Sequence, residues 1–237
     1  LLAVVVPGQG SQQPGLLNEW LTSPQNKNLI SKYSQISKLD LEKLGTLSSK
    51  NEIINTNITQ PLLTATSLVS NFNLHFNNLT NLVFAGHSVG EFSASVLAGF
   101  ITDEQALKLV SYRGKYMQDC ARETLNTGMA AVLGSNKELI IKELVKYDLY
   151  SANINSKNQI VAAGKLEAIQ NLVKNPIQGT KVIKLEVSGA FHTPYMKEAQ
   201  VKFDVKIKDE VFQIPKFKLL SNVDGFPISD PMELKQR

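Results

Sequence analysis

One stretch decides the fold, and it runs Leu82-Val83-Phe84-Ala85-Gly86-His87-Ser88-Val89-Gly90-Glu91. The apolar run 82–85 predicts a buried strand that ends at Gly86, and helical periodicity begins after Gly90. Ser88 therefore lies on a predicted strand-to-helix turn, with a glycine two residues to either side. Such glycines let the backbone turn sharply, and the free N–H groups at the start of the helix point towards whatever the hydroxyl attacks. Ser88 is thus a candidate nucleophile, although three fixed positions also occur by chance in loops.

The composition is that of a globular protein, with 43% hydrophobic and 19% charged residues. A chain of 237 residues can bury a sizeable core as one domain and still hold a smaller inserted one. No apolar run approaches the roughly 18 residues that span a bilayer, so we expect no membrane segment. The apolar residues 1–6 meet Pro7-Gly8 at once and have no basic residues before them, which predicts a first strand and not a signal peptide.

The cysteine and histidine content excludes several classes of site. A single cysteine, Cys120, cannot form an intramolecular disulfide and is consistent with a reducing cytosol. With three histidines in the chain, we expect no metal site. The net charge of +4 comes from scattered lysines that are not interleaved with aromatic residues, which argues against nucleic-acid binding. Because the first residue is Leu1, we expect the natural start to precede it; a transit peptide there would change a cytoplasmic location to an organelle stroma or matrix.

Two other segments could contribute to a site at the same sheet edge. The turn Pro7-Gly8-Gln9-Gly10-Ser11-Gln12 follows the first strand and exposes backbone N–H groups where open α/β sheets bind ligands, although most such turns have no role. A second helix is predicted from the capping box Thr102-x-x-Gln105 to about residue 121.

Arg113 lies in the middle of the apolar stripe of that helix, which consists of Ala106, Val110 and Met117. A guanidinium that faces the interior is unfavourable unless an anion meets it, and a carboxylate suits it because the contact can be bidentate. A structural salt bridge or a snorkelling side chain is the alternative.

The segment 126–187 predicts a second, smaller domain. Its strands are expected at 129–133, 151–154, 160–163 and 181–187, and its helices at 138–147 and 165–174. The succession strand–helix–strand–strand–helix–strand is the ferredoxin-like arrangement. We therefore expect a ferredoxin-like subdomain, 126–187, inserted in an α/β core made of 1–125 and 188–237. That core ends with a strand at 217–223 and a helix from Pro231 that stops at Arg237, so we expect its C-terminal part to be incomplete.

A serine nucleophile needs a base within hydrogen-bonding reach. His192 follows the small residues Gly189-Ala190 and precedes Pro194, on a loop that leads into a helix. His87 points away from the turn as the immediate neighbour of Ser88. His75 lies near the end of a helix predicted from Gln60-Pro61 to about residue 76, where a surface or capping role is expected. His192 is therefore the best candidate base, with a surface histidine as the alternative.

Five motifs in order resemble those of malonyl-CoA:acyl carrier protein transacylases, the acyltransferase family of fatty acid and polyketide synthesis. The resemblance extends from residue 1 to residue 224. The motifs are Gly8-Gln9-Gly10-Ser11-Gln12, Gly86-His87-Ser88-Val89-Gly90-Glu91, Tyr112-Arg113-Gly114-Lys115-x-Met117-Gln118, Gly189-Ala190-Phe191-His192 and Asn222-Val223-Asp224.

The resemblance implies an α/β-hydrolase-like core with a parallel sheet and an inserted ferredoxin-like α+β subdomain. It implies an S-malonyltransferase in which Ser88 forms the acyl-enzyme, His192 is the general base and then the acid, and Arg113 binds the free malonyl carboxylate. Backbone N–H groups of Gln9 and Val89 would form the oxyanion hole. The partners would be malonyl-CoA and acyl carrier protein, the enzyme a monomer, and no cofactor would be needed beyond the CoA and phosphopantetheine that the substrates carry.

Two features refine this resemblance. Phe191, directly before His192, resembles the malonyl-selecting version of the family, because its bulk leaves little room for a methyl branch. Family members usually continue past this C-terminus with a glutamine-containing segment followed by Pro-Val and an aromatic residue, and whether Gln236 is that glutamine stays open.

Two alternatives remain for the function. A serine esterase or thioesterase on the same core would have the chain order Ser, acid, His, but none of Asp103, Asp119 and Asp148 follows a predicted core strand, and Arg113 would have no role. The other alternative is an inactive carrier-protein-binding module, in which Lys115, Lys181 and Lys184 could meet an acidic partner. The joint presence of Ser88, His192 and Arg113 argues against it.

Overall fold

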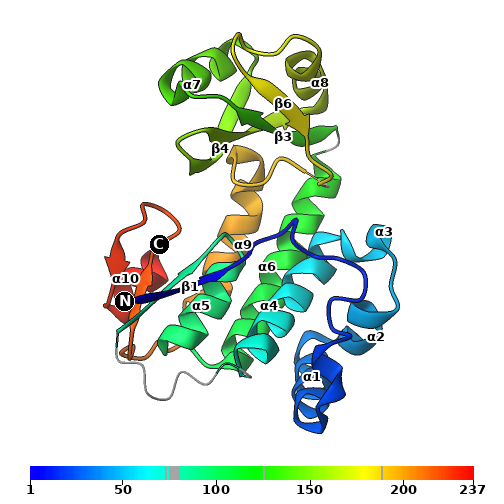
Figure 1. Cartoon of the computed structure of the whole chain (residues 1–237), viewed down its shortest axis with the longest axis vertical. Helices are drawn as coiled ribbons and strands as arrows, with labels where there is room; N and C mark the ends of the chain where they lie inside the picture. Colours follow the sequence, from blue (N-terminus) through cyan, green and yellow to red (C-terminus); the bar gives the residue numbers. More distant parts are fainter. Residues whose placement is uncertain (73, 75–80, 125, 188) are drawn as a thin grey trace. The chain divides into compact units, whose positions relative to one another are not determined.

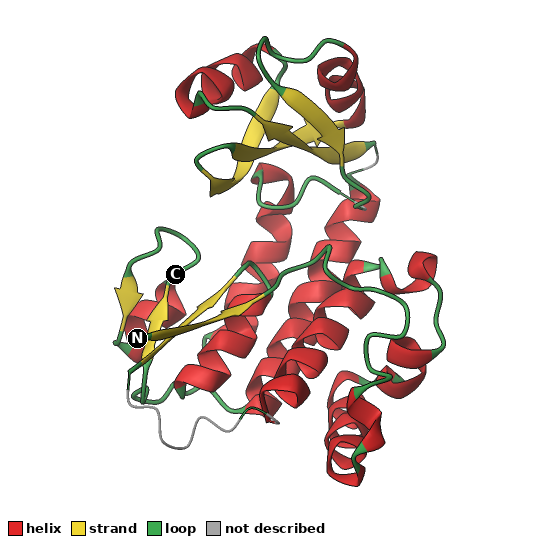
Figure 2. Ribbon diagram, in the orientation of Figure 1, coloured by secondary structure: helices red, strands yellow, loops and turns green. Residues whose placement is uncertain are grey.

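The computed structural model describes residues 1–72, 74, 81–124, 126–187 and 189–237 (Figures 1 and 2). Its helices and strands, in chain order, are β1 (Leu2–Val6), η1 (Trp20–Thr22), α1 (Pro24–Ser37), α2 (Leu41–Thr46), α3 (Lys50–Ile53), α4 (Thr56–Phe72), β2 (Leu82–Gly86), α5 (Gly90–Ala98), α6 (Asp103–Glu123), β3 (Thr127–Leu133), α7 (Lys137–Lys146), β4 (Leu149–Ser156), β5 (Gln159–Lys165), α8 (Leu166–Lys174), β6 (Lys181–Lys184), η2 (Pro194–Met196), α9 (Lys197–Ile207), β7 (Lys218–Leu220), β8 (Pro227–Ile228) and α10 (Pro231–Gln236).

The chain divides into two compact units. The core unit comprises Leu1–Lys115 and Phe203–Arg237, and the second unit comprises Tyr116–Lys202. Both boundaries fall within helices, α6 and α9, whereas the sequence places them at 125/126 and 187/188. The second unit gains these helical turns because Met117 and Cys120 of α6 and Ala199 of α9 join a hydrophobic cluster with residues of its sheet.

The sheet of the core unit has the order β1-β2-β7-β8. Strands β1, β2 and β7 are parallel, and β8 pairs with β7 in the antiparallel direction. Val4, Phe84 and Leu219 stand side by side in the register, and Phe84 and Leu219 are buried in a cluster with Ala94 and Ala98 of α5. Figure 1 shows α5 directly against the strands. The predicted parallel α/β core is therefore confirmed.

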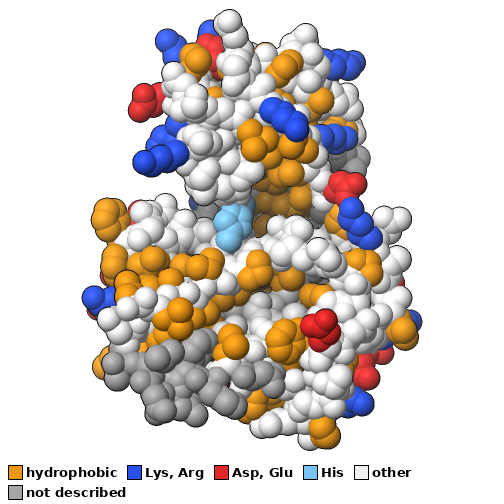
Figure 3. Space-filling model, viewed as in Figure 1, with side chains coloured by type: hydrophobic (Ala, Val, Ile, Leu, Met, Phe, Trp, Pro, Cys, Tyr) orange, Lys and Arg blue, Asp and Glu red, His pale blue; other side chains and the backbone are white. Residues whose placement is uncertain are grey.

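The opposite face of this sheet is apolar but open. Successive residues of a strand point to opposite faces, and Val5 is 71% exposed whereas Val6 is 2% exposed. Figure 3 shows hydrophobic side chains gathered over β1 on this face of the core unit. Within the ranges that the structure describes, no helix covers it.

A helical layer of α1, α2 and α4 packs through its own cluster, which includes Ile30, Leu41 and Leu62. The sequence predicts that α4 begins at Gln60-Pro61, and this is wrong: α4 begins at Thr56 and Pro61 lies inside it. The first turn forms because Thr59 is fully buried and its hydroxyl donates to the carbonyl oxygens of Ile53 and Asn55. Tertiary packing thus overrides the tendency of proline to start a helix.

The second unit contains the predicted strand–helix–strand–strand–helix–strand succession. Its sheet has the order β4-β5-β3-β6 with antiparallel neighbours, which is the ferredoxin-like order. Helices α7 and α8 pack on one face through Ile140, Leu144, Ile169 and Leu172. Figure 2 shows both helices on the same side of this sheet. The predicted ferredoxin-like subdomain is confirmed.

The ends of the helices in the core unit follow the predicted local signals. Gly99 ends α5 in the left-handed conformation with φ 94°. The capping box of α6 is reciprocal, because Gln105 N donates to Thr102 Oγ1 at 3.1 Å and Thr102 N donates to Gln105 Oε1 at 3.0 Å. Among the described residues, no helix is both long enough and apolar enough to cross a membrane.

Candidate active site

The turn between β2 and α5 has the geometry of a nucleophile elbow. Ser88 has φ 52°, a left-handed backbone conformation that residues other than glycine rarely adopt. The flanking glycines are required by close contacts, because a Cβ on Gly86 would lie 2.2 Å from Glu91 N and one on Gly90 would lie 2.5 Å from the carbonyl oxygen of Val6. The sequence motif therefore marks a strained turn whose neighbours leave no room for side chains.

The turn after β1 packs against this elbow. His87 N donates to the carbonyl oxygen of Val6 at 3.0 Å, and a Cβ on Gly8 would lie 2.5 Å from the carbonyl oxygen of His87. The side chain of Gln9, the next residue, is held by Thr56, because Gln9 Nε2 donates to Thr56 Oγ1 at 3.2 Å. The Gln9 turn and Val89 thus lie at the same edge of the sheet, as the sequence predicts. Their role as an oxyanion hole stays a prediction.

Arg113 lies beside Ser88. Its Nη2 donates to Ser88 Oγ at 3.2 Å, and its guanidinium lies 5.9 Å from the centre of the Phe92 ring. The Nη1 atom is fully buried and has no hydrogen-bond partner among the described residues. Burial lowers the pKa of Arg113 to about 10, against the opposing charge of Glu91, so the side chain is still a cation at neutral pH. The site therefore presents a buried cation with one donor atom, Nη1, that no described residue satisfies.

Helix α6 can place Arg113 there because Gly114 allows a close approach to α4. A Cβ on Gly114 would lie 2.8 Å from the carbonyl oxygen of Thr56. Ala106 and Val110, on the same stripe as Arg113, are fully buried. The predicted inward-facing arginine is confirmed, and the start of α4 contacts both α6 and the side chain of Gln9.

The structure adds two residues to the elbow whose contacts the sequence did not predict. Ser88 N donates to Asn222 Oδ1 at 2.9 Å, and Asn222 N donates to Glu91 Oε1 at 2.8 Å. Burial raises the pKa of Glu91 above its usual value, and the hydrogen bond from Asn222 and the charge of Arg113 offset this only in part. One feature of the sequence could have indicated the contact between Asn222 and Ser88: Asn222 lies just after a predicted strand, and that strand could have been placed beside β2.

His192 belongs to the second unit, and its role as base for Ser88 stays a prediction. It is exposed and has φ 58°, so it too lies on a strained turn. Its loop is held by Thr193, whose hydroxyl donates to the carbonyl oxygen of Ala190 at 2.6 Å, while Ala190 N donates to Thr127 Oγ1 at 3.3 Å. Phe191 is 4% exposed within a cluster of the same unit. His75 lies outside the described residues.

The acids considered for an esterase triad have other contacts or positions. Asp103 begins α6 and accepts hydrogen bonds from Lys32 Nζ and Tyr33 Oη, both at 3.0 Å. Asp148 lies 3.7 Å from Lys165 in the second unit, and Asp119 lies within α6. None of the three follows a strand of the core sheet.

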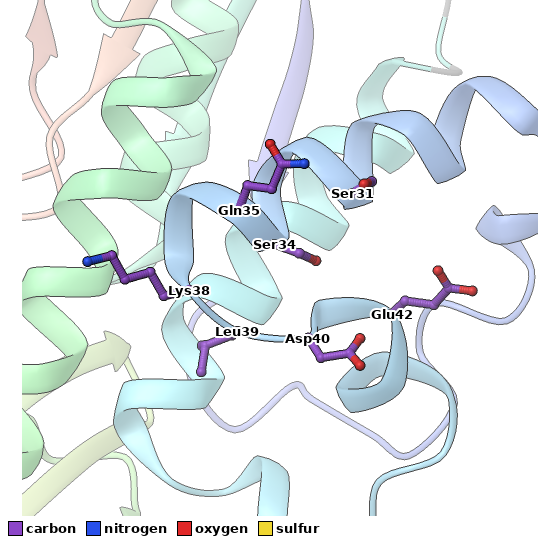
Figure 4. A pocket seen from close by; sticks show the side chains of 7 residues that line it. All are labelled: Ser31, Ser34, Gln35, Lys38, Leu39, Asp40 and Glu42. Carbon is purple, nitrogen blue, oxygen red and sulfur yellow. The ribbon is translucent and has the colours of Figure 1, made fainter.

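A surface pocket at the turn between α1 and α2 lacks the features of an active site. It has a volume of about 440 Å³ and is lined by Ser31, Ser34, Gln35, Lys38, Leu39, Asp40 and Glu42 (Figure 4). One lysine beside two acids gives it no preference for an anion, and no candidate site residue lines it.

A serine on a strained strand-to-helix turn, at the carboxyl edge of a parallel sheet, is typical of α/β enzymes with a serine nucleophile. The model of the acyl transferase domain family matches residues 4–230, and the chain belongs to this family. It is 39% identical over 233 residues to the malonyl CoA-acyl carrier protein transacylase of Mycobacterium tuberculosis, a match that covers 97% of this chain and 76% of that protein. A polyketide-biosynthesis malonyl CoA-acyl carrier protein transacylase of Bacillus subtilis is 32% identical, with coverages of 96% and 79%.

Solved structures agree with this assignment. The crystal structure of MCAT from Mycobacterium tuberculosis superposes with a TM-score of 0.92 at 37% identity, covering 99% of this chain and 78% of that one. The malonyl CoA-acyl carrier protein transacylase of Coxiella burnetii gives a TM-score of 0.90 at 29% identity, covering 99% and 76%. The α/β-hydrolase-like core with its ferredoxin-like insertion is thus the fold of these transacylases.

Proposed function

We propose that this chain transfers the malonyl group of malonyl-CoA to the phosphopantetheine thiol of acyl carrier protein, in fatty acid synthesis, through an acyl-enzyme on Ser88. The observation that carries the proposal is the guanidinium of Arg113, which donates to Ser88 Oγ at 3.2 Å and has a buried Nη1 atom without a partner among the described residues. A buried cation with one unsatisfied donor atom next to a nucleophile suits an acyl group that carries its own carboxylate. Relatives named for this reaction support the same substrate.

In this mechanism Ser88 Oγ attacks the thioester carbonyl carbon while His192 accepts the hydroxyl proton. The N–H groups of Gln9 and Val89 stabilise the oxyanion of the tetrahedral intermediate. When the intermediate collapses, the C–S bond breaks and His192 gives the proton to the departing CoA thiolate. The thiol of the carrier protein then attacks the seryl ester, its proton passes to His192, and Ser88 leaves as a protonated hydroxyl.

Arg113 selects the acyl group by charge. The free carboxylate of a malonyl ester lies one methylene from the ester carbonyl, and therefore close to Ser88 Oγ, which is where the guanidinium lies. An acetyl group has no carboxylate and leaves the buried donor unsatisfied. Unpaired buried charges cost several kcal/mol, so the difference favours malonyl over acetyl in both binding and transfer.

The proposal also covers the cofactor requirement, the oligomeric state and the location of the protein. The acyl carriers arrive with the substrates, so the reaction requires no further cofactor or metal. We further propose a monomer in the cytoplasm, where a reducing environment keeps the buried thiol of Cys120 free.

Labelling with radioactive malonyl-CoA tests the proposal. The chain should take up one acid-stable label, Ser88→Ala should take up none, and Ser135→Ala, which removes an exposed hydroxyl in the second unit, should label normally. Added holo acyl carrier protein should remove the label as malonyl-carrier protein. Release of free malonate at the same rate without carrier protein would instead indicate a thioesterase, and labelling of Ser88→Ala would exclude Ser88 as the nucleophile.

A further inference from the structure

We propose that Glu91 and Asn222 form a relay that holds Ser88 in its reactive conformation, so that both are positioning residues for the acylation step. The Glu91–Asn222 relay rests on the proposed function in one respect, namely that Ser88 is the nucleophile. Its evidence is a closed ring of three hydrogen bonds. Ser88 N donates to Asn222 Oδ1 at 2.9 Å, Asn222 N donates to Glu91 Oε1 at 2.8 Å, and Glu91 N donates to the carbonyl oxygen of Ser88 at 3.0 Å.

Ser88 needs such a device because its backbone is strained. At φ 52° the serine is in the left-handed region, which L-residues leave readily unless the surroundings fix them. Its N–H falls between the end of β2 and the start of α5, where neither element offers an acceptor in its regular ladder. The amide oxygen of Asn222 supplies that acceptor, and the strained peptide is thereby held from outside.

Asn222 is in place because of the sheet. Strand β7 runs parallel to β2, with Ala85 opposite Leu220, so the two residues that follow β7 emerge at the edge where the elbow turns. The backbone of Asn222 is then fixed by the carboxylate of Glu91 in the first turn of α5. Three elements, β2, β7 and α5, are thus joined through one serine peptide.

The carboxylate of Glu91 also has a charged environment. Arg113 on α6 and Arg237 after α10 face it with positive charge, and Asp224 with negative charge. The hydrogen bond that Glu91 accepts and the charge that it carries can therefore be tested separately. Replacement by glutamine keeps an oxygen that can accept from Asn222 N and removes the charge, whereas replacement by alanine removes both.

The experiment measures two rates on folded protein. One is single-turnover acylation of Ser88 by malonyl-CoA, and the other is labelling by a fluorophosphonate, which attacks an activated serine without needing a malonyl group. Asn222→Ala and Glu91→Ala should each slow both rates about tenfold, equivalent to 1.36 kcal/mol in the barrier. The KM for malonyl-CoA should change less than about threefold, because Arg113 is retained, and Glu91→Gln should restore both rates to within about threefold of the original.

Matched controls separate positioning from general stability. Asn55→Ala removes a half-buried asparagine whose side chain donates to the carbonyl oxygen of Glu52, and Glu104→Ala removes an exposed acid in the first turn of another helix. Both should label at the original rate, even where their melting temperatures fall as far as that of Glu91→Ala.

Two results would overturn the relay: folded Asn222→Ala that reacts with the fluorophosphonate at the original rate, or Glu91→Gln that is as slow as Glu91→Ala. Asn222 is exposed, so its truncation leaves no cavity in the core; should it still fail to fold, the two Glu91 variants decide the question. Failure of the proposed function has a different signature. The unmodified chain would then react with the fluorophosphonate at Ser88 but accept no malonyl group from malonyl-CoA.

Discussion

Replacing Arg113 with lysine should make the preference for malonyl-CoA depend on pH. Burial lowers the pKa of Arg113 to about 10, so the guanidinium stays charged throughout the neutral range. The same burial would lower the pKa of a lysine below its usual value of about 10.4. Because the cation exists below its pKa, Arg113→Lys should bind the malonyl carboxylate at pH 7 and lose it as the pH rises through the lowered pKa of the lysine.

The expected magnitudes follow from the geometry. Lysine keeps the charge but has no planar fork, so one of two charged hydrogen bonds is lost. At about 1.5–3 kcal/mol, this loss reduces kcat/KM for malonyl-CoA about 10- to 150-fold at pH 7. As the lysine loses its proton at alkaline pH, the preference for malonyl-CoA should fall further. Arg113→Ala should show no preference for malonyl-CoA at neutral or alkaline pH.

The assay is the ratio of kcat/KM for malonyl-CoA to that for acetyl-CoA, measured from pH 6.5 to pH 9. The ratio cancels the pH dependence of any step that both donors share. The unmodified chain should give a flat ratio over this range and Arg113→Lys a falling one. A flat profile for Arg113→Lys, parallel to that of the unmodified chain, would refute the assignment of the carboxylate to Arg113.

Three further changes test the scaffold of the site. Gly90→Ala should destabilise the fold by about 1–3 kcal/mol and slow acylation, because the new methyl group meets backbone carbonyl oxygens. Gly128→Ala is the control, since its Cβ would meet one side-chain atom at 3.2 Å. Its melting temperature should fall less than that of Gly90→Ala. Thr102→Ala removes the cap of α6 and should lower the free energy of unfolding by about 1 kcal/mol in urea titrations. Burial raises the pKa of Asp103, but its hydrogen bonds outweigh this and hold the pKa below 3.8. Its stabilisation is therefore fully present above the unfolded pKa and lost as the pH falls through the lower folded pKa, so Asp103→Asn should cost about 1 kcal/mol at pH 7 and progressively less in acid; a cost that does not change with pH would contradict this.

Much of the fold could be predicted because its signals are local. Strand, turn and helix around Ser88 follow one another within a short stretch, and the capping box of α6 is complete within four residues. The ferredoxin-like unit was predictable for the same reason, since its strands and helices alternate with clear turns. Arg113 could be identified as facing inwards from the stripe of its own helix.

What could not be predicted depends on contacts between distant segments. The start of α4 at Thr56 is a more local case, because the buried Thr59 donates to the carbonyl oxygens of Ile53 and Asn55, and this outweighs the signal of Pro61. The unit boundaries lie within α6 and α9 because of hydrophobic contacts with the second sheet. The bond between Asn222 and Ser88 requires knowing that β7 neighbours β2, and no periodicity in the sequence reports that neighbourhood.

The hydrogen bond between Ser88 and Asn222 joins residues that are 134 positions apart in the chain. At a synthesis rate of about 5–20 residues per second, a ribosome makes the serine about 7–27 seconds before it makes the asparagine. Until β7 docks beside β2, the N–H group of Ser88 lacks the acceptor that Asn222 supplies. From the proposed relay we expect the rate of Ser88 labelling to rise about tenfold during refolding, at the step at which β7 joins the core sheet.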